Sequence, residues 1–79
     1  MSPLIKTRPA LISFGHQLRR VRIGVRISQR ELARRSRVGY RFISETELGR
    51  ENPSLETIVL LAEGLGCEVA EFFPRKDGD

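Results

Sequence analysis

The chain has 79 residues, one cysteine (Cys67), one histidine (His16) and no apolar run near the roughly 18 residues of a membrane span, which argues against an internal disulfide, a typical zinc site and a transmembrane helix. Its net charge of +4 is unevenly placed, because residues 1–50 hold twelve Lys or Arg against three acidic residues, whereas residues 51–79 hold two against seven. We therefore expect one soluble, cytoplasmic domain with no cofactor, no metal and no membrane partner, whose basic half is a candidate surface for nucleic acid.

The amino-terminal residues show little hydrophobic periodicity. Residues 1–10 include Pro3 and Pro9, and we expect a flexible basic arm there. From Leu11 onward, apolar residues recur at steps of three and four, which predicts a helix with one buried face that ends near Gly24. The apolar positions of this face are Leu11, Phe14, Leu18, Val21 and Val25.

Two short helices are predicted next. Ser28 is a good N-cap residue, and Glu31 three positions later completes the S-x-x-E pattern of a capping box. The second helix then runs to about Ser36, and residues 37–39 form a turn. A third helix is expected from Tyr40 to Glu47 with Ile43 facing inward, and Gly49 supplies the left-handed residue after its end.

The remaining third of the chain is predicted to be helical as well. Ser54 caps a fourth helix, Gly66 ends it, residues 69–73 form a last short helix, and residues 74–79 are a polar tail. No stretch alternates as a strand does, so the fold class is all-α with five helices, and residues 11–73 make up the folded domain. The buried face of the fourth helix is expected to comprise Leu55, Ile58, Leu61, Ala62 and Leu65.

The segment from Ser28 to Gly66 resembles the Cro/C1-type helix-turn-helix family, and the resemblance spans about residues 11–73. It implies a compact, lambda-repressor-like domain, with the helix-turn-helix at about 28–47, that binds double-stranded DNA and regulates transcription. Small proteins of this form include restriction-modification controllers, phage repressors and antitoxins. The matching positions are Ser28, Gln29, Leu32, Ala33, Val38, Ile43, Ser44, Glu47, Gly49, Pro53, Ser54, Leu55, Ile58, Leu61, Ala62, Leu65 and Gly66.

The resemblance, together with Ile43 facing inward, assigns the DNA contacts. The third helix presents its outward residues to base edges; Arg41 suits guanine and Glu45 suits cytosine, although each contact has simple surface exposure as its alternative. The expected base contacts are Tyr40, Arg41, Ser44 and Glu45, and the expected phosphate contacts are Ser28, Gln29, Arg50 and Asn52.

Three further positions have structural implications. By resemblance, Arg22 and Glu47 form a partly buried ion pair between the first and third helices. Arg37 stands where the family has a turn glycine, so either the turn takes another form or it carries strain of about 1 kcal/mol.

One such domain reads too few base pairs for useful specificity, so we expect a homodimer on a palindromic operator. The acidic, apolar carboxy-terminal third is the expected dimer surface, with Leu60, Val69 and Phe73, although these residues can instead close the core. RNA polymerase is a possible further partner. The alternative function is that of an antitoxin-type module that sequesters a toxin. No catalytic motif is present, so we do not expect an enzyme.

Overall fold

The computed structural model describes residues 3–74, and side chains from residue 9 onward. These residues form four α-helices and a short 3-10 helix, with no strand among them, so the all-α prediction with a helix-turn-helix is confirmed. No helix in this part of the chain combines the length and apolar character of a membrane span. The elements are α1 (Pro3–Val25), α2 (Gln29–Ser36), α3 (Tyr40–Glu47), α4 (Leu55–Leu65) and η1 (Val69–Phe72).

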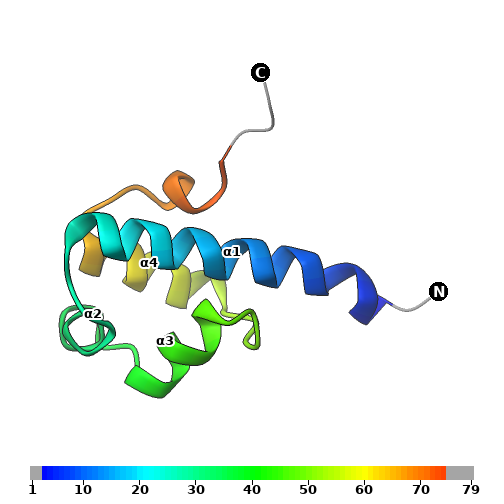
Figure 1. Ribbon diagram of the computed structural model, residues 1–79, viewed down its shortest axis with the longest axis horizontal. Coiled ribbons are helices and arrows are strands. Elements are labelled where there is room, and N and C mark those ends of the chain that lie inside the picture. Colours follow the sequence, from blue (N-terminus) through cyan, green and yellow to red (C-terminus); the bar gives the residue numbers. More distant parts are fainter. Residues whose placement is uncertain (1–2, 75–79) are drawn as a thin grey trace.

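Helix α1 begins earlier than the sequence suggested. It starts at Pro3 rather than near Leu11, so the arm expected over residues 1–10 is helical from residue 3, while residues 1 and 2 lie outside the described residues. Proline is tolerated at a first helical position because its missing N–H would have no helical partner there. Pro9 lies inside the helix, where it removes one backbone hydrogen bond without ending the helix. The amino-terminal end of α1 projects beyond the other helices (Figure 1).

The two helices of the helix-turn-helix begin and end where the local signals predict. The Ser28 hydroxyl accepts a hydrogen bond from the Glu31 backbone N–H and caps α2. The reciprocal half of the capping box is replaced, because the Glu31 carboxylate accepts from Arg34 and Arg35. Arg37 then adopts the left-handed conformation, with φ at 63°. Of the two alternatives for this turn, the structure has the strained one, with an arginine in the left-handed conformation.

Helix α4 and the segment after it follow the prediction, with one exception. Ser54 caps α4 and Gly66 ends it with a φ of 70°. Leu55, expected on the buried face, is 71% exposed. Leu55 is the first residue of α4, and contact with the core begins one turn later, at Ile58. Val25, the last residue of α1, is likewise outside the core. The polar tail beyond Pro74 lies outside the described residues.

The core lies where the four α-helices and η1 meet, and each of them contributes at least one buried apolar residue. Helix α1 packs against α3 and η1, and α2 packs against α3 and α4 (Figure 1). Phe72 closes the core edge-to-face against Phe14, with ring centroids 5.3 Å apart. The buried apolar residues are Phe14, Leu18, Leu32, Val38, Ile43, Leu61, Ala62, Leu65 and Phe72.

Candidate nucleic-acid interface

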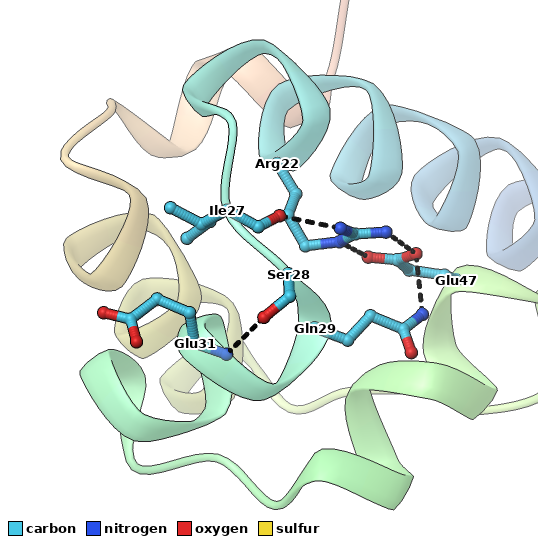
Figure 2. A network of polar contacts seen from close by, with 6 residues as sticks. All are labelled: Arg22, Ile27, Ser28, Gln29, Glu31 and Glu47. Carbon is cyan, nitrogen blue, oxygen red and sulfur yellow. Dashed lines mark hydrogen bonds and ion pairs between the residues drawn. The ribbon is translucent and has the colours of Figure 1, made fainter.

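An ion pair joins the end of α1 to the end of α3. Arg22 Nε donates to Glu47 Oε2 at 2.6 Å and Arg22 Nη2 donates to Glu47 Oε1 at 3.0 Å (Figure 2). Arg22 Nη1 also donates to the backbone oxygen of Ile27 at 2.8 Å. The side chains are only 11% and 3% exposed, and the hydrogen bonds to Glu47 raise the pKa of Arg22. This two-pronged pair ties α3 to α1 and to the loop before α2.

Gln29 belongs to the same network. Its Nε2 donates to Glu47 Oε1 at 3.0 Å, so Glu47 connects residues from α1, α2 and α3 (Figure 2). The sequence assigned Gln29 to a DNA phosphate and did not reveal this bond. The second amide hydrogen and the backbone N–H at the start of α2 are not used by this contact.

Helix α3 is anchored by one of its faces. Ile43, Thr46 and Glu47 are buried, whereas Arg41 is exposed and Tyr40 is 41% exposed. Of the other two expected base contacts, Ser44 and Glu45, both are partly exposed. Phe42 packs against the core.

Helix α3 sits close to α1 because Gly15 has no side chain. A Cβ at Gly15 would lie 2.4 Å from the Thr46 backbone oxygen and 2.9 Å from that of Glu47. Only glycine permits this separation. Sequence periodicity does not reveal such a contact, because the two sides are about thirty residues apart in the chain.

Two of the expected DNA-contacting residues lie next to each other. Arg50 Nη1 is 3.6 Å from Glu45 Oε1, and the Arg50 backbone N–H donates to the Glu45 backbone oxygen at 3.0 Å. Arg50 and Asn52 are both exposed after the end of α3. A residue expected to contact bases and one expected to contact phosphate therefore share one edge of α3.

A hollow lies between the starts of α2 and α3. The Arg30 guanidinium carbon stands 4.3 Å from the centroid of the Tyr40 ring, a cation–π contact that the sequence did not indicate. Within residues 3–74, no group of three or more His, Cys, Asp or Glu could hold a metal ion. The hollow is lined by Arg22, Ser28, Gln29, Arg30 and Tyr40.

The expected dimer residues differ in how accessible they are. Leu60 and Val69 are partly buried and pack against the core, whereas Phe73 is 54% exposed and its ring lies 5.6 Å from that of Phe14. Cys67 also packs against the core, and burial raises the pKa of its thiol.

The fold and this arrangement define the class of protein. It is a helical domain whose helix-turn-helix presents its second helix, α3, at the surface while anchoring it to the core. The helix-turn-helix family model matches residues 18–72. The chain belongs to the helix-turn-helix family of Cro/C1 type, and it is a DNA-binding transcriptional regulator. The resemblance to this family found in the sequence is confirmed.

Two solved structures are similar to this chain. The restriction-modification controller protein C.AhdI from Aeromonas hydrophila is 35% identical over 82% of this chain and 98% of that one, with a TM-score of 0.80. The clp gene regulator ClgR from C. glutamicum is 35% identical over 78% of this chain and 80% of that one, with a TM-score of 0.74. No curated protein matches the sequence.

Proposed function

We propose that this regulator binds a specific operator in double-stranded DNA as a homodimer, each subunit placing the outward face of α3 in the major groove. The observation that carries the proposal is the division of α3 into two faces: Ile43, Thr46 and Glu47 are buried on one face, while Tyr40 and Arg41 are exposed. A recognition helix needs this combination of firm support and accessible side chains.

Base recognition is assigned to the outward residues of α3. Arg41 is exposed, and its planar guanidinium can donate two hydrogen bonds to a guanine edge. Glu45 can accept from a cytosine amino group, and Arg50 beside it then turns from Glu45 to the DNA backbone. Ser44 lies between Arg41 and Glu45 along the helix and completes the proposed set of base-reading residues.

Phosphate contacts are assigned to the start of α2 and to the segment after α3. Gln29 has one amide hydrogen beyond the one given to Glu47, and Ser28 lies at the exposed end of α2. Arg50 and Asn52 supply a second group of contacts beyond α3. Such contacts fix the orientation of the domain without reading sequence.

The dimer is assigned to the carboxy-terminal part of the domain. Phe73 is the most exposed of the three expected residues, and Leu60 and Val69 border the same core. The acidic residues lie mainly in this third of the chain, so pairing there leaves the basic surface for DNA. A palindromic operator follows from the two-fold symmetry of such a dimer. Occupancy of the operator, in the cytoplasm where its DNA lies, would block RNA polymerase or contact it.

A titration with random and with selected duplexes over a salt series tests the proposal. Affinity for random duplex should fall steeply as salt rises. Arg41→Ala should abolish the preference for the selected sequence, whereas Gln29→Ala should weaken every duplex to a similar degree. Absence of binding by the wild type at low salt would refute DNA binding. Equal effects of both variants on all duplexes would refute the division between base and phosphate contacts.

A further inference from the structure

The hollow between the starts of α2 and α3 holds an arginine that the assignment above leaves without a role. The hollow has a volume of about 350 Å³, and Arg30 and Tyr40 form part of its lining. The Arg30 guanidinium lies over the Tyr40 ring at 4.3 Å from its centroid. Both residues are exposed, so this stack is at the surface, beside the residues proposed to contact DNA.

The two arginines of the hollow differ in their charge balance. The charge of Arg22 is matched by Glu47, to which it donates two hydrogen bonds. Arg30 forms no ion pair with any residue whose side chain the structure describes, since the neighbouring carboxylate of Glu31 is bonded to Arg34 and Arg35. The hollow therefore carries one uncompensated positive charge, and it comes from Arg30.

The Tyr40 ring holds the Arg30 guanidinium in a position from which it can bind an anion. Stacking on a ring face restricts the long arginine side chain and leaves the N–H groups at the edge of the guanidinium open. That edge matches two oxygens of a phosphate, and the polar residues Ser28 and Gln29 line the same hollow. An arginine held in place loses less conformational entropy on binding than a free one.

We propose that Arg30 binds a phosphate of the DNA backbone in this hollow and that Tyr40 is its positioning residue. This inference rests on the proposed function, and it adds Arg30 to the DNA contacts. It also changes the role of Tyr40, which was expected to contact a base. The Tyr40 ring supports a contact common to all sequences, and base reading on α3 begins at Arg41.

A salt series on random duplex DNA tests the role of Arg30. Arg30→Ala should bind about tenfold more weakly for each subunit. The slope of log affinity against log salt should fall by about 0.9 for each subunit bound. Arg20→Ala is the matched control, because Arg20 is an exposed arginine of α1 bonded to Gln17; it should leave the slope unchanged. An unchanged slope for Arg30→Ala would overturn the proposal.

Variants of Tyr40 test the positioning role. Tyr40→Phe keeps the ring and should bind DNA as tightly as the wild type does. Tyr40→Leu should lose a large part of the affinity that Arg30→Ala loses, without a change in sequence preference. In the Arg30→Ala background, Tyr40→Leu should add almost nothing. A changed base preference, an additive effect or a loss in Tyr40→Phe would each overturn the positioning role.

Controls separate this inference from the proposed function and from misfolding. Both residues are exposed, so thermal melting should show all the variants folded. If the wild type binds no DNA at low salt, the proposed function and this inference fail together. If the wild type binds and the Arg30→Ala slope is unchanged, this inference alone fails.

Discussion

Replacing Glu47 by alanine should remove a large share of the stability of the domain. Glu47 accepts two of the three hydrogen bonds that the Arg22 guanidinium donates, and the Arg22 side chain is only 11% exposed. Without Glu47, this cation would stay largely out of water with only the Ile27 backbone oxygen as partner. Breaking a buried ion pair from one side costs about 3–5 kcal/mol. The total free energy of unfolding of a domain of this length is about 4–12 kcal/mol, so the Glu47→Ala variant should be only marginally stable.

Urea unfolding followed by circular dichroism measures this loss. Glu31→Ala is the control, because Glu31 also pairs with arginines but at the surface; its unfolding midpoint should change little. The double variant Arg22→Met with Glu47→Leu should be clearly more stable than Glu47→Ala, since it leaves no buried charge. A loss below about 1 kcal/mol for Glu47→Ala, or a double variant no more stable than the single one, would refute the reasoning.

Four other changes probe the backbone and polar groups around the helix-turn-helix. Gly15→Ala should destabilise the domain by about 1–3 kcal/mol in urea unfolding and weaken DNA binding, because its Cβ would lie 2.4 Å from the Thr46 backbone oxygen. Gly24→Ala in the same helix meets no atom within 4 Å and should instead stabilise by up to about 1 kcal/mol. Arg37→Gly should raise the melting temperature, because the left-handed φ of 63° costs a non-glycine residue about 1 kcal/mol and costs glycine almost nothing. A lower melting temperature would contradict this. Thr46→Val should also stabilise, by about 1 kcal/mol, because the buried hydroxyl has no hydrogen-bond partner among the described residues. Finally, hydrogen bonds from Arg34 and Arg35 lower the pKa of Glu31 from 4.5 to about 2. The ionised Glu31 carboxylate therefore gives the folded state a small, solvent-screened stabilisation that is present above pH 4.5 and lost as the pH falls through 2, and an NMR titration with a Glu31 midpoint near 4.5 would contradict the lowered pKa.

Local signals in the sequence were enough to predict most of the fold. Ser28 and Ser54 cap their helices, and Gly49 and Gly66 have positive φ, as expected. These features depend on neighbouring residues only, which is why a single sequence reveals them. Leu55 shows where this reasoning fails, because a helix pattern says which residues share a face but not how far the partner helix extends.

The contacts that shape the candidate interface could not be read in the same way. The stack of Arg30 on Tyr40 and the bond from Gln29 to Glu47 join residues of different helices. Whether two such side chains meet depends on how α2 and α3 cross, which is set by packing of the whole core. The pairing of Arg22 with Glu47 was expected only because the chain resembles a known family.

The distribution of anchors along α3 separates stability from DNA reading. A helix of eight residues is too short to persist alone in water, so its geometry must come from tertiary contacts. Those contacts lie on one face of α3, where Ile43 enters the core and Glu47 bonds to Arg22. Tyr40 and Arg41 are exposed and contribute little to holding the helix. Substitutions of Tyr40 or Arg41 should therefore change DNA binding at constant stability, whereas substitutions of Ile43 or Glu47 should change both together.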